Sequence, residues 1–176
     1  MGMDVIGLEP TMPEGETFRR SIWGWRPLAE MVCTLEPELT SGCTHWQSND
    51  GDGLDAETSK ELSDALQRDI AAGRVERLVN ARDKRIAALP PRPCNQCAGT
   101  GIRSDELGVE QGQTSRIIGR DTEAAPDHPR FGQTGWCNGC NGTGSNESLE
   151  AWYHASVDDV AEFATFLATC GGFEIC

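Results

Sequence analysis

The chain is poor in histidine, in basic residues and in long apolar runs. None of its apolar stretches approaches the roughly 20 residues of a membrane-spanning helix, so we expect a soluble protein with no membrane insertion. The acidic opening segment, residues 1–18, has neither a basic n-region nor an apolar h-region, which predicts no secretory signal and a cytoplasmic location. None of the three histidines has Glu two residues later, which excludes the His-x-Glu signature of zinc deaminases.

Positive charge is scarce and unevenly spread. Fifteen Lys and Arg residues stand against 28 Asp and Glu, and the net charge of −13 disfavours nucleic acid as a partner. Residues 68–92 are the exception, with seven basic and three acidic side chains. On a helix over residues 74–89, four basic side chains fall within one arc beside the apolar stripe: Arg74, Arg77, Lys84 and Arg85. A solvated face that pairs with acidic neighbours is the favoured interpretation, and contact with phosphates or a partner is the alternative.

One octapeptide occurs twice, as "CNQCAGTG" at residues 94–101 and "CNGCNGTG" at residues 137–144. A Cys-x-x-Cys turn directs two sulfurs toward one point, and the following glycines permit the positive φ with which the chain folds back. Two such turns supply the four sulfurs of a closed tetrahedral zinc site. The sequence therefore predicts one structural Zn²⁺ ion with these ligands: Cys94, Cys97, Cys137 and Cys140.

These octapeptides resemble the Cys-x-x-Cys-x-Gly-x-Gly repeats in the cysteine-rich domain of DnaJ-type co-chaperones. That family carries four repeats, which pair to bind two zinc ions, so the resemblance implies one zinc here and a module that contacts other proteins. It covers residues 93–144, and the chain lacks the His-Pro-Asp motif of a J-domain, which argues against a co-chaperone. The remainder resembles bacterial or phage proteins of unassigned function, which implies no activity.

Helical periodicity dominates outside this region. Pro27 is expected in the first turn of a helix that ends before Pro37, after an extended segment that holds Trp23 and Trp25. Further helices are expected from the cap Asp55 to Gly73, over residues 74–89, and from a capping box of Ser156 with Asp159 to the Gly171-Gly172 pair.

The predicted fold is mainly α, with a small irregular or β zinc-knuckle arm, so that a four-cysteine zinc site interrupts a helical core. Residues 1–92 would form the core, residues 93–144 the arm, and residues 145–176 a C-terminal helix that packs back on the core. Residues 102–136 are loop-rich, with a short hairpin expected around "RIIG".

Weaker signals leave alternatives open. His45, Asp50 and Asp52 suggest a small hydrolytic centre, against a packing histidine and an Asx-rich turn before a helix cap. Phe131 and Trp136 either cover the knuckles or anchor a partner. The four remaining cysteines are expected to be free, disulfide-bonded or ligands of a second metal: Cys33, Cys43, Cys170 and Cys176.

The sequence favours a non-catalytic zinc-binding protein that acts through protein–protein interaction. This hypothesis follows from the closed four-sulfur site, from the acidic surface and from the lack of any complete catalytic set. Two alternatives remain: a nucleic-acid-associated factor that uses the basic helix 74–85 beside the knuckles, and a small hydrolase centred on His45, Asp50 and Asp52.

Overall fold

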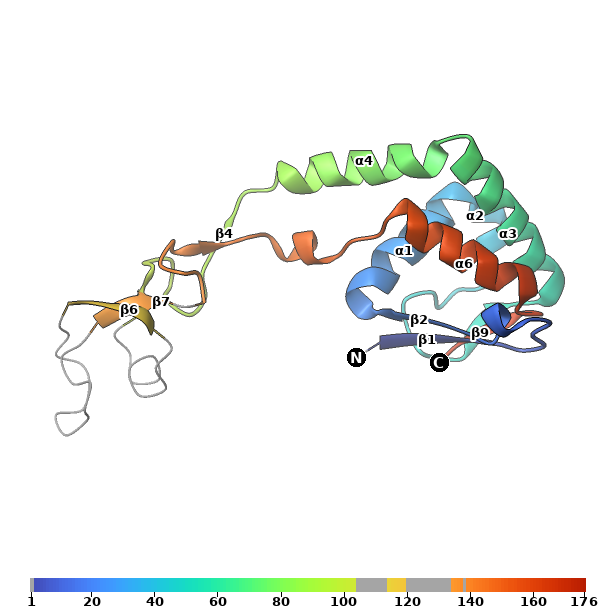
Figure 1. The fold of residues 1–176 in the computed structure, drawn as a ribbon, viewed down its shortest axis with the longest axis horizontal. Coiled ribbons are helices and arrows are strands. Elements are labelled where there is room, and N and C mark those ends of the chain that lie inside the picture. Colours follow the sequence, from blue (N-terminus) through green and yellow to red (C-terminus); the bar gives the residue numbers. More distant parts are fainter. Residues whose placement is uncertain (1, 104–113, 120–133, 138) are drawn as a thin grey trace. The chain divides into compact units, whose positions relative to one another are not determined.

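The computed structural model describes residues 2–103, 114–119, 134–137 and 139–176. The chain divides into two compact units (Figure 1). The first, here called the helical unit, comprises Met1–Ala88 and Glu150–Cys176, and the second, here called the cysteine unit, comprises Leu89–Leu149. The divisions therefore fall a few residues outside the expected boundaries at 92/93 and 144/145.

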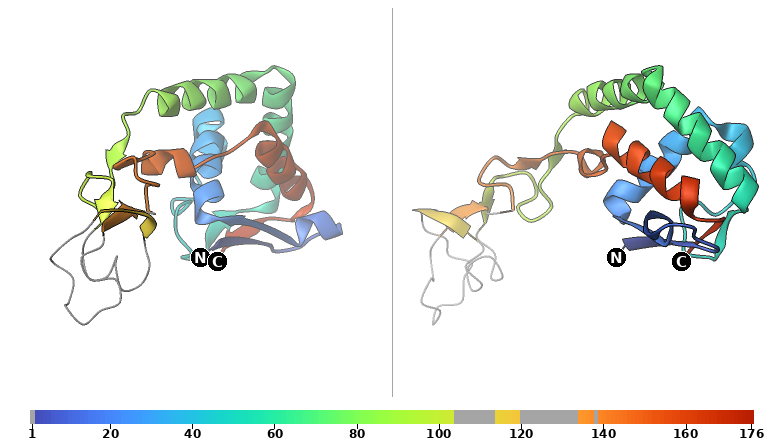
Figure 2. Two further views of the ribbon diagram at one scale, coloured as in Figure 1. Left: turned by 60° about the vertical axis from the view of Figure 1, so that its left-hand side comes forward. Right: turned by 45° about the vertical axis from the view of Figure 1, so that its right-hand side comes forward.

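The helical unit contains a four-stranded antiparallel sheet with the order β2-β1-β9-β3. Its strands are β1 (Gly2–Gly7), β2 (Thr17–Ser21), β3 (Asp52–Leu54) and β9 (Phe173–Ile175). Figure 2 shows the helices on one side of this sheet. A mainly α fold with a small sheet is confirmed, but the sequence prediction placed β structure only in the cysteine segment. The sheet was missed because its central pair, β1 and β9, joins the two ends of the chain.

Most described helices of this unit begin and end at the capping residues and glycines that the sequence predicted. They are α1 (Ile22–Leu35), α2 (Pro37–Thr40), α3 (Ala56–Ala71), α4 (Arg74–Ala87) and α6 (Val157–Thr169), with short 3₁₀ turns at Pro13–Gly15 and Leu149–Trp152. The Asp55 carboxylate accepts from the Thr58 N–H at 2.8 Å, and Ser156 and Asp159 form the predicted capping box. Gly73 separates α3 from α4 in the left-handed conformation, with φ +67°.

Helix α1 begins earlier than its proline suggests. Trp23 and Trp25 lie inside it and not in an extended segment, because the helix is capped by the Ser21 hydroxyl, which accepts from Gly24 N–H at 3.3 Å. Pro27 has no N–H, so it leaves the Trp23 carbonyl without its helical donor. The backbone N–H of His154 takes that place at 3.2 Å, and the helix continues through the proline.

Aromatic packing dominates the core between the sheet and the helices. The rings of Trp25 and Trp46 stack with centroids 6.2 Å apart, and Phe163 lies 5.7 Å from Trp25. The buried indole of Trp25 donates to the Trp46 carbonyl at 2.6 Å, so this polar atom is satisfied. Helix α6 also packs on α3, where the buried Ser63 hydroxyl donates to the Ala164 carbonyl at 2.6 Å. None of the described helices is long and apolar enough to cross a bilayer.

The cysteine unit is built from short strands and turns. In it, β4 (Arg92–Pro93) pairs with β8 (Ser145–Asn146), and a second sheet has the order β5-β7-β6. The strands of that sheet are β5 (Ile102–Arg103), β6 (Thr114–Gly119) and β7 (Thr134–Cys137). The "RIIG" segment lies in β6, which pairs with β7, and residues 120–133 between them lie outside the described part.

Candidate metal centre

The two octapeptides bring four buried thiols to one point in the cysteine unit. Cys94 Sγ lies 3.9 Å from Cys137 Sγ, and Cys97 Sγ lies 3.7 Å from Cys140 Sγ. All four sulfurs lie within 4.8 Å of one another, and each cysteine is at most 7% exposed. Such a group could hold a metal ion, and the four residues are the predicted ligands.

The two copies fold alike around their sulfurs. In the first copy the Gly101 N–H donates to Cys97 Sγ at 3.2 Å, and in the second the Gly144 N–H donates to Cys140 Sγ at 3.3 Å. These amides place positive dipoles against the second sulfur of each turn, which favours the thiolate that a metal requires. The matching donor distances show that the sequence repeat is a repeat of backbone conformation.

The threonines explain why the repeat extends beyond its cysteines. Thr100 Oγ1 donates to the Cys97 carbonyl at 2.7 Å, and Thr143 Oγ1 donates to the Cys140 carbonyl at the same distance. Each hydroxyl also accepts from a backbone N–H two residues later, that of Ile102 at 3.2 Å in the first copy. Each threonine therefore closes its own turn, and the turn does not depend on the other copy.

Backbone contacts then join the two copies. The Cys94 N–H donates to the Gly144 carbonyl at 2.9 Å, and the Cys137 N–H donates to the Gly101 carbonyl at 2.8 Å. Gly101 and Gly144 have φ of +75° and +78°, and a Cβ on Gly101 would collide with the Gly142 carbonyl. Glycine is required at these positions both by the left-handed conformation and by the close approach of the other turn.

The repeat breaks where Gln96 corresponds to Gly139. The Gln96 side chain lies where a Cβ on Gly139 would be, and the Cys137 thiol donates to its Oε1 at 3.8 Å. One copy therefore supplies a side chain and the other supplies the space for it. In the sequence this position is only a mismatch between the two copies, so its role was missed. A glycine in one copy at the position of a long polar residue in the other was the signal that could have indicated the contact.

Burial and hydrogen bonding act in opposite directions on the free thiols. For Cys94, burial opposes ionisation, but backbone N–H groups of Gln96 and Cys97 lower the pKa of its thiol to about 7. For Cys137, burial raises the pKa of the thiol to about 12. Ionisation is therefore easier at Cys94 than at Cys137, and a bound cation would favour the thiolate form of the buried cysteines.

The structure pairs His45 with Asp52 but keeps Asp50 apart from them. His45 Nδ1 lies 3.2 Å from Asp52 Oδ2, and the same oxygen accepts from the Thr44 and His45 N–H groups at 2.6 and 2.8 Å. These backbone donors lower the pKa of the Asp52 carboxyl well below its usual range. Asp50 accepts instead from the Ser48 hydroxyl. The Asp52 carboxylate thus closes a loop before β3, as an Asx-rich turn does.

Three of the four basic side chains predicted to share one arc of α4 have partners within the helical unit. Arg74 lies 2.6 Å from Asp69, Arg77 donates to the Ala72 carbonyl at 3.1 Å, and Arg85 lies 2.6 Å from Glu150. Lys84 is exposed. The favoured interpretation, a solvated helix face with acidic neighbours, therefore holds for Arg74 and Arg85.

Of Phe131 and Trp136, which were predicted either to cover the knuckles or to anchor a partner, only the Trp136 backbone belongs to the described structure. Trp136 is in β7 and its backbone pairs with Ile102 of β5, whereas its side chain and the whole of Phe131 lie outside the described residues.

The four other cysteines are free thiols in the described structure. Cys43 and Cys170 are buried, and burial raises the pKa of the Cys43 thiol to about 12 and that of Cys170 above its ordinary value. Cys33 is half-buried and Cys176 is exposed. Within the described ranges, the four-cysteine cluster is the only group of three or more metal-ligating side chains that could hold an ion.

Comparison with protein-family models, with curated proteins and with solved structures found no match for this chain.

Proposed function

We propose that this chain is a non-catalytic zinc-binding protein that acts by binding another protein. The observation that carries the proposal is the convergence of four buried thiols, from two equivalent turns, to within 4.8 Å of one another. Zinc bound tetrahedrally by thiolates at about 2.3 Å separates the sulfurs by about 3.8 Å. The Cys94–Cys137 and Cys97–Cys140 distances of 3.9 and 3.7 Å are close to that value.

The choice of zinc follows from the donor set. Four soft sulfur ligands in a tetrahedral arrangement select zinc or an iron–sulfur centre over calcium or magnesium, which take oxygen ligands. The two-turn arrangement with amide donors to sulfur is the geometry of structural zinc sites. Zinc has no redox chemistry, and a site closed by four protein ligands leaves no position for water or substrate. A structural role fits this donor set best.

Binding to another protein is the mode of action that fits a closed site on a strongly acidic chain. The net charge of −13 opposes phosphate-rich partners, and Arg74 and Arg85 of the basic helix already pair with carboxylates. In the candidate hydrolytic centre, the Asp52 oxygen that faces His45 accepts hydrogen bonds from two backbone N–H groups. This oxygen therefore stabilises the loop, which is a structural role. The nucleic-acid and hydrolase alternatives are therefore less well supported than a binding function.

Elemental analysis of protein purified without chelator tests the metal. We expect one zinc per chain in the wild type and none in Cys94→Ser, with full retention in Cys176→Ser, whose exposed thiol lies in the helical unit. Iron in place of zinc, or zinc retained in Cys94→Ser, would refute the assignment. Heparin chromatography at low salt tests the nucleic-acid alternative: passage without retention removes it, whereas salt-sensitive retention supports it against a protein partner.

A further inference from the structure

A second site lies in the helical unit, along the seam between α1 and α4. Three hollows of about 260, 250 and 360 Å³ follow one another there. The first and second share Thr34 and Leu78 in their walls, and the second and third share Pro27, Arg82 and others. Because neighbouring hollows share walls, they form one continuous groove, which we call the arginine groove.

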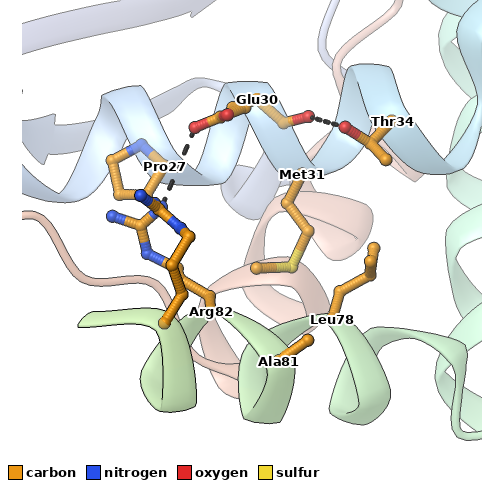
Figure 3. A pocket seen from close by; sticks show the side chains of 8 residues that line it. Pro27, Glu30, Met31, Thr34, Leu78, Ala81 and Arg82 are labelled. Carbon is orange, nitrogen blue, oxygen red and sulfur yellow. Dashed lines mark hydrogen bonds and ion pairs between the residues drawn. The ribbon is translucent and has the colours of Figure 1, made fainter. Parts of the chain in front are cut away.

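The floor of the groove is apolar. Figure 3 shows Met31 of α1 facing Leu78 and Ala81 of α4 across the middle hollow, with Pro27 at one side. Helix α4 contributes only Val75 to the fully buried core; Leu78 and Val79 pack against that core but stay partly exposed, and Ala81 is exposed. An exposed strip of this kind, bounded by polar residues, is typical of a surface that binds a partner.

The rim of the groove is positively charged. Five arginines line its three hollows: Arg26, Arg74, Arg77, Arg82 and Arg85. Glu30 and Glu150 are the acidic residues in the same walls. Arginines thus outnumber acidic side chains in the walls of the groove, and carboxylates of an occupant would compete with Asp69 and Glu150 for Arg74 and Arg85.

Arg82 has donor capacity that the helical unit does not use. Its side chain is 15% exposed and lies 3.8 Å from the Glu30 carboxylate, and it donates to the Tyr153 carbonyl at 2.9 Å (Figure 3 shows the pair with Glu30). Its Nε atom is buried and has no hydrogen-bond partner among the described residues. Because an unsatisfied buried donor is costly, a rearrangement of Arg82 toward an oxygen of an occupant would be favourable.

Exposed aromatic rings extend the groove at its third hollow. Tyr153 lines that hollow, and its ring centroid lies 4.7 Å from that of Trp23. Trp152 lies 5.8 Å from Trp23, and the two tryptophans are 55% and 36% exposed. Tryptophan, tyrosine and arginine are the residue types that contribute most to protein–protein binding energy. This combination is therefore suited to a peptide rather than to a small ion.

We infer that the arginine groove binds an acidic amphipathic segment of a partner protein. Apolar side chains of the segment would fill the three hollows, and its carboxylates would pair with the arginines on the rim. From Arg74 to Arg85 the groove follows α4 for about 17 Å, the length of roughly three helical turns. Nucleic acid would also pair with the arginines, but it would leave the apolar floor of the groove uncovered. The inference rests on the proposal that the protein acts by binding another protein, and it is independent of the metal.

Selection from a displayed library of random peptides of about 16 residues tests this inference. We expect the selected peptides to be rich in Asp and Glu, with apolar residues at helical spacing. In fluorescence polarisation, the double variant Arg77→Glu/Arg85→Glu should weaken binding of a selected peptide by about tenfold or more, and Ala81→Phe should weaken it by filling the middle hollow.

The control for charge is Arg19→Glu/Lys60→Glu, which makes the same change of charge outside the groove at two exposed side chains. It should leave the affinity within about twofold, and circular dichroism checks that each variant is folded. Selection of basic peptides, equal binding by the groove variant, or tighter binding of a 12-base-pair DNA duplex would overturn the inference.

One further variant separates this inference from the proposed function. If peptide binding is lost in Cys94→Ser but kept in the groove variant, the partner binds the cysteine unit, and the inference fails while the proposed function stands. If the groove binds acidic peptides but the protein contains no zinc, the metal assignment fails and the groove remains.

Discussion

The two units of this chain differ in what they bury. In the helical unit the largest fully buried side chains are aromatic and aliphatic, among them Trp25, Phe163 and Leu66. In the cysteine unit the only buried cluster among the described residues consists of the four cysteines. Burial of apolar area is the main source of stability for a domain, and a small unit without it needs a covalent or metal cross-link. The helical unit therefore has an apolar core to stabilise it, whereas the cysteine unit would depend on the metal ion that we propose.

Removal of the proposed metal should have the largest effect, and it should separate the stabilities of the two units. A structural zinc site contributes on the order of 10 kcal/mol, so chelation or Cys94→Ser should unfold the cysteine unit and leave the helical unit intact. Amide hydrogen exchange measures both units in one experiment. Loss of protection in α3 and α6, or retained protection around Gly101 and Gly144 without metal, would contradict the expectation.

Truncation of the aromatic core should destabilise the helical unit and leave the metal site of the cysteine unit unchanged. Phe163 is fully buried between Trp25 and Phe173, so Phe163→Ala should lower the free energy of unfolding of the helical unit by about 3–5 kcal/mol. Urea titration followed by tryptophan fluorescence measures the loss, and zinc content should stay at one per chain. Thr165→Ala, at an exposed position of the same helix, serves as the control and should change stability by less than about 0.5 kcal/mol.

Two glycines of one turn separate the cost of the left-handed conformation from the cost of the close approach between the two turns. Gly99 and Gly101 both have positive φ, but only at Gly101 would a Cβ collide with the backbone of the other copy. Gly99→Ala should cost about 1–2 kcal/mol through the left-handed conformation alone, and Gly101→Ala should cost more. Competition with a chromogenic zinc chelator compares their affinities. Equal affinities would show that the close approach of the two turns contributes nothing.

The smallest expected effect concerns the capping box of α6. Burial opposes ionisation of Asp159, but hydrogen bonds from Ser156 and Arg20 lower the pKa of its carboxyl in the folded protein. A lowered pKa means that the stabilisation is complete above the unfolded pKa, near 3.9, and is lost as pH falls through the folded value. Asp159→Asn should therefore cost about 1 kcal/mol at neutral pH and reduce the loss of stability between about pH 5 and 2. Urea titrations at several pH values measure both, and an unchanged slope would refute the assignment to Asp159.

The sequence predicted most helix boundaries because they depend on local chemistry. Asp55, Gly73 and the Ser156 capping box each act within one turn, and the structure places helix ends at all three. Helix α1 begins at the local Ser21 cap, but it continues through Pro27 because a distant donor, the His154 N–H, takes the free Trp23 carbonyl, and this distant contact was not predictable. The sheet was missed for the same reason, since β1 pairs with β9 across nearly the whole chain.

The candidate metal centre was easier to predict than the fold around it. A repeated octapeptide identifies four sulfurs without any knowledge of tertiary structure, and the structure brings those sulfurs together. The contact of Gln96 with Gly139 was not predictable from the repeat, because it depends on how the two copies approach each other. The arginine groove was missed because half of its wall comes from α1, which the search for basic residues along α4 did not include.

The ion pair between Arg85 and Glu150 has a consequence for engineering. It holds together the two points at which the chain leaves and re-enters the helical unit, because Arg85 and Glu150 lie close to either end of the interruption. Replacing residues 89–149 with a short Gly-Ser linker should therefore give a chain that still folds, since closing a short loop costs little entropy. Such a minimised protein would make the helical unit a portable scaffold, to which an unrelated domain can be grafted at the same junction.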